Sequence, residues 1–147
     1  MPLIIRPVTH EDRSAWEALF RGYAAFYKTD PDPALEAVWT WVTDPAEPYW
    51  SEIAWGPDGT ALGLVQYSLM HRSLSGQQVV YLSDLFTTPA ARGQGVGRAL
   101  IERVRAFARE NGYPSVRWLT AEDNAAARKL YDTYTPASGF ILYAIAP

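Results

Sequence analysis

The sequence predicts an α/β fold in which one mixed sheet carries helices on both faces. Segments with helical and strand periodicity alternate along the chain: one strand, two helices, three strands, and then helix, strand, helix and strand. No repeat, low-complexity run or linker interrupts the 147 residues. We therefore expect a single domain that spans residues 1–147.

The N-terminal part is predicted to supply one strand and two helices. Residues 3–7 fit a short strand, and the run from Thr9 to Asp12 fits a helix-capping pattern. Large apolar side chains then recur at helical spacing and indicate a helix with an aromatic face: Trp16, Leu19, Phe20, Tyr23, Phe26 and Tyr27. The proline-containing segment 30–33 ends this helix, and residues 34–42 fit a second, shorter one.

The rest of the chain alternates between strands and helices. Three strands are predicted in the middle of the chain, the first two joined by a glycine-containing hairpin turn: residues 50–55, 61–70 and 79–87. Two helices and two strands follow in alternation: helix 95–110, strand 115–120, helix 124–134 and strand 140–145. Together these segments give the element order on which the fold prediction depends.

The composition excludes several classes of function. The net charge of −3 does not favour binding to nucleic acid, and no apolar run approaches the roughly 20 residues that span a bilayer. The chain lacks cysteine, which removes disulfides, thiolate nucleophiles and cysteine-ligated zinc. With only two histidines, neither a metal site nor a Ser-His-Asp triad is predicted. We expect a cytoplasmic protein with no nucleic-acid or membrane partner and no metal.

The loop Arg92-Gly93-Gln94-Gly95-Val96-Gly97 carries the functional signal. It lies between a strand and an amphipathic helix, where exposed backbone N–H groups and the helix dipole attract a phosphate. A Walker A loop needs Gly-Lys-Ser/Thr, whereas this loop continues Gly97-Arg98-Ala99. A dinucleotide fingerprint needs a third glycine where Arg98 stands. The remaining pattern is R-x-x-G-x-G, formed by Arg92, Gly95 and Gly97.

This pattern resembles the cofactor motif of GCN5-related N-acetyltransferases (GNAT). The match includes the preceding strand, from Tyr81 to Pro89, and continues through Leu100. Downstream, the segments Glu122-Asp123-Asn124 and Leu130-Tyr131 resemble the next elements of the family at the expected spacing. Within the family, the chain looks most similar to the branch that contains fungal histone and D-amino-acid N-acetyltransferases and polyamine N-acetyltransferases.

The resemblance implies a GNAT fold with a mixed, mostly antiparallel sheet of about six to seven strands and about four helices. It also implies acetyl-CoA as co-substrate, with its pyrophosphate on the glycine loop and its pantetheine arm paired with the preceding strand. Arg92 would hold either the loop or a phosphate oxygen. The implied cofactor-binding residues are Leu85, Phe86, Thr87, Arg92, Gly93, Gln94, Gly95, Val96, Gly97, Arg98 and Asn124.

Tyr131 and Asp84 are the predicted catalytic residues. A phenol can protonate the departing CoA thiolate because the two groups are of comparable basicity. Asn124 lies seven residues before Tyr131, so both side chains share one helix face about 10 Å apart. Asp84 is an amine anchor or a base that acts through water, and Glu122 is a second candidate base. Each of these residues also has a purely structural alternative. Asn124 would only cap the helix, Tyr131 would only pack in the core, and Asp84 would only accept backbone hydrogen bonds.

The predicted reaction is direct transfer of acetyl to a primary amine in a ternary complex. The acceptor is expected to be a small amine, a polyamine or an amino acid, with a histone or other protein lysine as the alternative. A non-catalytic acyl-CoA-binding regulatory domain is a further alternative. The acceptor pocket is expected near Tyr23, Tyr27, Asp30 and His71. By analogy with the family, the apolar segment from Ile141 to Ile145 suggests a homodimer.

Overall fold

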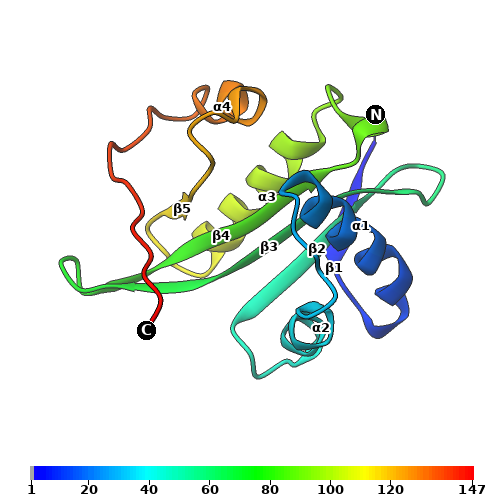
Figure 1. Cartoon of the computed structure of the whole chain (residues 1–147), viewed down its shortest axis with the longest axis horizontal. Coiled ribbons are helices and arrows are strands. Elements are labelled where there is room, and N and C mark those ends of the chain that lie inside the picture. Colours follow the sequence, from blue (N-terminus) through cyan, green and yellow to red (C-terminus); the bar gives the residue numbers. More distant parts are fainter. Residues whose placement is uncertain (1) are drawn as a thin grey trace.

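The computed structural model describes residues 2–147 and is built around one five-stranded sheet (Figure 1). The strands lie side by side in chain order: β1 (Ile4–Pro7), β2 (Tyr49–Trp55), β3 (Ala61–Arg72), β4 (Gln77–Thr87) and β5 (Val116–Trp118). The first four pair antiparallel, and β5 pairs parallel to β4. The sheet is therefore mixed and mostly antiparallel, as predicted.

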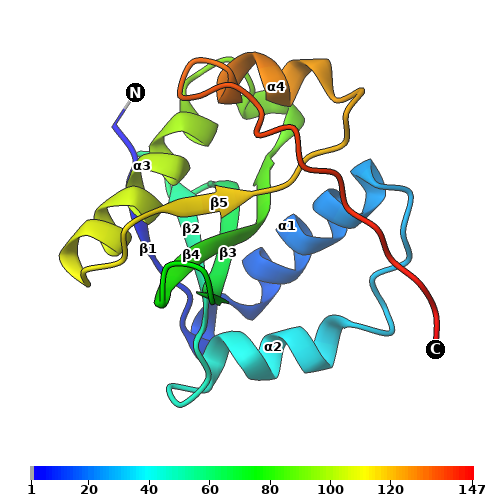
Figure 2. The same ribbon diagram turned by 90° about the vertical axis from the view of Figure 1, so that its left-hand side faces the viewer.

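Helices cover both faces of the sheet, and Figure 2 shows α3 on the face opposite to α1 and α2. The helices are α1 (Arg13–Phe26), α2 (Leu35–Thr43), α3 (Val96–Glu110) and α4 (Ala125–Tyr131), with short 3-10 turns at His10–Asp12 and Pro89–Ala91. One buried cluster lies between α1, α2 and the sheet, and a second lies between α3 and the sheet. Within residues 2–147 no helix combines the length and the apolar character needed to cross a membrane.

The start of α1 follows the predicted capping pattern. The carboxylate of Asp12 accepts a hydrogen bond of 2.8 Å from the backbone N–H of Thr9, so one free N–H of the helix entry is satisfied. Arg6 on β1 donates to both oxygens of the same carboxylate. The Arg6 guanidinium is the main reason that the pKa of Asp12 lies below its usual value. Asp12 therefore ties the first strand to the first helix.

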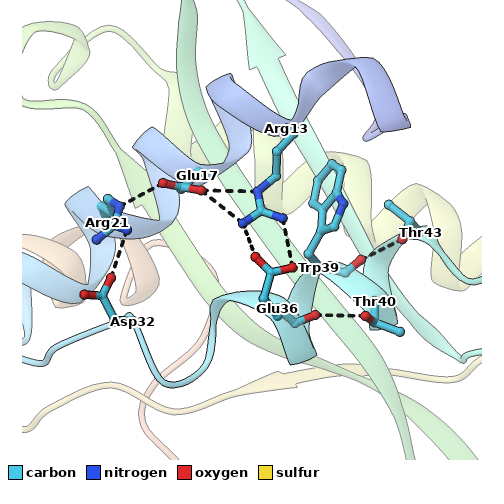
Figure 3. Close-up of polar contacts among 8 residues, drawn as sticks. All are labelled: Arg13, Glu17, Arg21, Asp32, Glu36, Trp39, Thr40 and Thr43. Carbon is cyan, nitrogen blue, oxygen red and sulfur yellow. Dashed lines mark hydrogen bonds and ion pairs between the residues drawn. The ribbon is translucent and has the colours of Figure 1, made fainter.

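Charged side chains join α1 to α2 on the outside of the molecule (Figure 3). Arg13 on α1 forms ion pairs with Glu17, at 3.1 Å, and with Glu36 on α2, at 2.7 Å. Further along α1, Arg21 pairs with Glu17 and with Asp32 in the connecting loop. These groups are partly or fully exposed, so each pair contributes little to stability, and together they link α1 to α2 and to the loop between them.

The prediction of a last strand at residues 140–145 is wrong, because these residues do not join the sheet. The sheet has five strands rather than six or seven, and residues 136–147 form no helix or strand. A segment with high strand propensity becomes a strand only when a neighbouring strand accepts its hydrogen bonds. Here the chain leaves α4 through Pro136 and through Gly139 in the left-handed region (φ 87°), and it does not return to β5. We call residues 136–147 the tail.

Candidate active site

The site begins where β4 extends beyond β5. The parallel pairing ends at Leu82 and Trp118, but β4 continues to Thr87. Its other side pairs with β3 over this stretch, and the N–H of Thr88 donates to the Leu62 carbonyl on that side. Because backbone groups alternate between the two sides of a strand, the backbone of Leu85 and Thr87 faces the open edge. A ligand with its own amide groups fits this edge as an added strand.

The backbone of Phe86, by contrast, pairs with Leu64 on β3. Its side chain is buried in the cluster beneath α1 and α2. Of the three predicted residues on this strand, Leu85 and Thr87 therefore present backbone groups to the open edge, and Phe86 supports the strand from the core.

The glycine loop connects this edge to α3. Gly93 and Gly95 adopt φ angles of 78° and 84°, a region that side-chain-bearing residues rarely occupy. A Cβ atom at either position would meet no protein atom within 4 Å, so both residues face open space. At Gly97 a Cβ would lie 3.3 Å from Leu130, so this glycine lets α4 approach α3. The loop thus presents an uncovered backbone at the positive end of a 15-residue helix.

The polar side chains of the loop are partly used inside the protein. Arg92 donates to the Thr87 carbonyl at 3.3 Å, and its guanidinium lies 5.8 Å from the centre of the Phe26 ring. Gln94 donates to the Ala90 carbonyl, and Arg98 donates to Thr133 beyond α4. These contacts hold the loop in shape without covering its backbone at Gly93 and Gly95.

Helix α4 carries the predicted Asn124 and Tyr131. Asn124 is the N-cap, and its side-chain oxygen accepts a hydrogen bond of 3.3 Å from the Ala127 N–H. Tyr131 lies half-buried at the other end of α4, with its ring edge-on to Trp118 at 5.4 Å. Burial, with a smaller effect of Tyr27, raises the pKa of Tyr131 to about 12. The phenol is therefore protonated at neutral pH, as a proton donor must be.

Asp84 lies on β4 at a bulge in the sheet. Gln66 on β3 pairs with Asp84, but the next residue, Tyr67, pairs with Leu82, so Ser83 is the extra residue. The bulge brings Ser83 and Asp84 together with Tyr49 of β2, whose hydroxyl lies 2.9 Å from Ser83 and 3.1 Å from Asp84. Gln66 donates to the same carboxylate at 2.7 Å.

The surroundings of Asp84 are aromatic and uncharged. Burial and the nearby negative charge of Asp84 raise the pKa of Tyr23, Tyr49 and Tyr81 above its usual value. These phenols therefore stay neutral, and none of the ion pairs found within residues 2–147 includes Asp84. The half-buried carboxylate thus lacks a counter-charge.

The remaining predicted residues lie in different places. Tyr23 faces Asp84 from α1, and Tyr27, one helical turn further, approaches Tyr131 closely enough to affect its pKa. Asp30 is exposed and accepts a bond from the Asp32 N–H. His71 is exposed, five residues along β3 from Gln66, or about 16 Å away.

Glu122 is exposed just before α4, where its backbone carbonyl accepts a bond from Arg128. No hydrogen bond of its carboxylate with Asp84 or the tyrosines is found within residues 2–147. In the same range, no group of three or more His, Cys, Asp or Glu side chains is arranged to hold a metal ion.

Gln66, Trp16, Tyr49 and Ser83 also belong to the site, and sequence reasoning missed their roles. Gln66 is fully buried in the middle of β3, directly after the apolar run from Ala61 to Val65. A polar residue there is a signal in the sequence, because a buried amide needs partners. Nothing in the sequence identifies those partners, since they lie on other elements.

Comparison with known proteins identifies the family to which this chain belongs. A family model described as the Acetyltransferase (GNAT) family matches residues 14–134. The chain belongs to the GNAT family. It is 33% identical over 143 residues to the D-amino-acid N-acetyltransferase HPA3 of Saccharomyces cerevisiae, which covers 96% of this chain and 89% of that protein. This relative is consistent with the predicted fungal branch of the GNAT family.

Two further GNAT comparisons support the family and the fold. The chain is 31% identical over 111 residues to the aminoglycoside N(6')-acetyltransferase type 1 of Stenotrophomonas maltophilia, which covers 74% of this chain and 69% of that protein. The structure of AAC(6')-Iy in complex with the bisubstrate analog CoA-S-monomethyl-acetylneamine superimposes with a TM-score of 0.86 at 22% identity, over 100% of this chain and 99% of that one. The GNAT fold is confirmed, and the chain is an acetyl-CoA-dependent acetyltransferase.

Proposed function

We propose that this enzyme acetylates a primary amine of a small molecule and that Asp84 binds the amine. The observation that carries the proposal is the half-buried Asp84 carboxylate, which is surrounded by neutral donors and has no cation beside it among the described residues. An ammonium group supplies the missing counter-charge, and the neighbouring tyrosine rings favour a cation as well. An alkylammonium must also lose a proton before it attacks, and Asp84 would take that proton directly or through water.

We assign the binding of acetyl-CoA, the acetyl donor, to the open edge of β4 and to the glycine loop. The loop N–H groups from Gly93 to Arg98 would bind the pyrophosphate of acetyl-CoA, and Leu85 and Thr87 would bind the pantetheine amides. Asn124 begins the helix on the other side of this edge. Tyr131, at the opposite end of that helix, would protonate the thiolate that leaves when the amine attacks the thioester carbon.

A small acceptor is preferred over a protein lysine for a structural reason. Tyr23 and Tyr49 are partly buried and lie beside Asp84, so aromatic side chains flank the half-buried carboxylate, as suits a small amine. The printed names of the relatives, a D-amino-acid and an aminoglycoside N-acetyltransferase, are consistent with this preference. Acetylation of a histone or other protein lysine is the alternative.

The proposal is tested by release of free CoA thiol from acetyl-CoA. The purified protein is assayed against polyamines, amino acids of both hands, aminoglycosides and histone-tail peptides. We expect at least one small primary amine to be turned over faster than any peptide. Faster turnover of a peptide would favour protein acetylation, and tight binding of acetyl-CoA without turnover of any amine would favour a regulatory domain.

The variant Asp84→Asn tests the role of the carboxylate with the best acceptor. We expect the KM for the amine to rise at least tenfold, because a charge-assisted hydrogen bond is lost, and the acidic limb of the pH–rate profile to disappear. The KM for acetyl-CoA is expected to stay unchanged. An unaltered acidic limb together with an unaltered amine KM would exclude Asp84 from both roles.

We also propose that the protein forms a homodimer in which the tail is covered. The tail exposes large apolar side chains, with Phe140, Tyr143 and Ile145 each more than four-fifths exposed. In Figures 1 and 2 it runs from α4 as an extended red chain. The outer edge of β5 is also unpaired in this sheet. A strand-forming segment and a free sheet edge in one chain, not joined to each other, fit reciprocal pairing between two copies.

A further inference from the structure

A buried series of hydrogen bonds runs from α1 to the carboxylate of Asp84. The indole N–H of Trp16 donates to the Oε1 atom of Gln66 at 2.9 Å, and the Nε2 atom of Gln66 donates to Oδ2 of Asp84 at 2.7 Å. Trp16 and Gln66 are both fully buried. Trp16 is itself held by Phe20, stacked at 5.1 Å, and by Trp39 at 5.0 Å.

Trp16 decides which way the Gln66 amide points. An amide can present either its oxygen or its nitrogen to a neighbour, but an indole N–H can only donate. The bond from Trp16 therefore requires Oε1 of Gln66 to face α1, which turns Nε2 toward Asp84. With the amide reversed, its oxygen would face the carboxylate, and two acceptors would repel each other without water to separate them.

The two oxygens of Asp84 consequently differ. Oδ2 accepts from Gln66 at 2.7 Å and from Tyr49 at 3.1 Å, and Ser83 lies 3.5 Å away. These three contacts all end on Oδ2, and the Tyr23 hydroxyl from α1 also hydrogen-bonds to the carboxylate, which contributes to the raised pKa of Tyr23. Oδ2 is occupied by donors, so a proton or an ammonium group that reaches Asp84 meets Oδ1.

We propose that Trp16 and Gln66 are positioning residues, which hold Asp84 so that Oδ1 alone faces the amine acceptor. The proposal rests on the role of Asp84 in the proposed function. Neither residue needs to touch the substrate, because both act through the carboxylate.

The other groups that face Asp84 do not replace this function. The titratable groups around it are Tyr23 from α1, Tyr49 from β2 and Tyr81 from β4, and all three stay neutral near pH 7 because their pKa values are raised. The charge of these phenols does not change in the acidic range where carboxylates titrate, so the phenols do not produce the acidic limb. A change in the acidic limb of the pH–rate profile therefore reports on Asp84 and its amide partner.

The test is the pH–rate profile of Trp16→Phe and Gln66→Met with the best amine acceptor. Phe keeps an aromatic ring but lacks the N–H, and Met keeps the length of Gln but lacks the amide. We expect kcat/KM for the amine to fall about tenfold and the acidic limb to leave its wild-type position in both variants, because the carboxylate loses a hydrogen-bond donor. The KM for acetyl-CoA should not change. The double variant should shift the limb no further than Gln66→Met alone.

Trp55→Phe is the matched control. Trp55 is a partly buried tryptophan packed against the same cluster, and its indole N–H has no hydrogen-bond partner among the described residues. Its replacement should leave the acidic limb unchanged even if it lowers the melting temperature. A merely structural role of Trp16 would lower stability in the same way without moving the limb.

The two proposals fail in different ways. If Asp84→Asn leaves the acidic limb of the wild-type enzyme in place, the proposed role of Asp84 fails. If Asp84→Asn removes the limb but Trp16→Phe and Gln66→Met leave it at the wild-type pH, the positioning role is overturned. The folded fraction of each variant is measured at every pH and the rate is divided by it, because a destabilised variant that unfolds in acid would also move an acidic limb.

Discussion

Tyr131 illustrates how the surroundings of one side chain determine its chemistry. Its spacing from Asn124 places both residues on α4, but the spacing says nothing about the protonation of the phenol. Burial against Trp118 and the approach of Tyr27 raise its pKa to about 12. A raised pKa also makes the phenol a weaker acid, so Tyr131 would give its proton only to a thiolate that forms in direct contact with it.

We expect Tyr131→Phe to lower kcat about a hundredfold, the usual contribution of a general acid. The dissociation constant for acetyl-CoA should change less than twofold, because only the hydroxyl is removed. Steady-state kinetics and calorimetric titration with acetyl-CoA measure the two quantities. Tyr134→Phe is the control, since the Tyr134 hydroxyl is buried without a partner among the described residues. A similar kcat for both variants would remove Tyr131 from the proton-donor role.

The glycine loop and α3 form the element that is best predicted from the sequence. Arg92 to Gly97 is a contiguous segment, and the backbone angles that its glycines adopt are a local property. The bulge in β4 is the opposite case. It arises from the register between β3 and β4, which pair residues 18 positions apart at Gln66 and Asp84. The strand around Asp84 could be predicted, but the bulge that turns Ser83 and Asp84 toward Tyr49 could not.

The loop supplies a matched pair of variants, Gly95→Ala and Gly59→Ala. Both glycines have positive φ angles, 84° and 80°, and a Cβ atom would meet no protein atom within 4 Å at either position. We expect each variant to lower the free energy of unfolding by about 1 kcal/mol, because alanine is strained in this region. Only Gly95→Ala should also weaken acetyl-CoA binding, by about tenfold, since its methyl group enters the phosphate site.

Thermal unfolding and titration with acetyl-CoA measure the two effects of these variants. Equal acetyl-CoA affinity in Gly95→Ala and Gly59→Ala would contradict the assignment of the loop.

The whole molecule leaves its apolar tail uncovered. Strand propensity alone predicted a sixth strand at residues 140–145, and the same residues are instead the most exposed large apolar group of the chain. An exposed segment of this kind promotes association, because its large apolar side chains are uncovered and it is not paired with a strand of the sheet. In the proposed dimer, the second copy would cover these side chains and pair with the segment.

We expect the purified protein to be a dimer by light scattering coupled to size-exclusion chromatography. The double variant Phe140→Asp and Ile145→Asp should be monomeric, because two charges would have to be buried in the interface. Leu74→Asp is the control, since Leu74 is an equally exposed apolar residue in the β3–β4 turn. It should leave the dimer intact. A monomeric wild-type protein, or a dimer that persists in the double variant, would refute the tail-mediated assembly.

The sequence by itself determined the element order as far as α4, the glycine loop, the family and the residues Asp84, Asn124 and Tyr131 as candidates, because each depends on a pattern within a few neighbouring positions. Only the tertiary structure decided how Asp84 is held and whether the tail joins the sheet. Trp16 and Gln66 are 50 residues apart, and their contact exists only after α1 has packed on β3. Local patterns specify what a segment can form, whereas the partners of a buried polar group or of a strand are chosen by long-range packing.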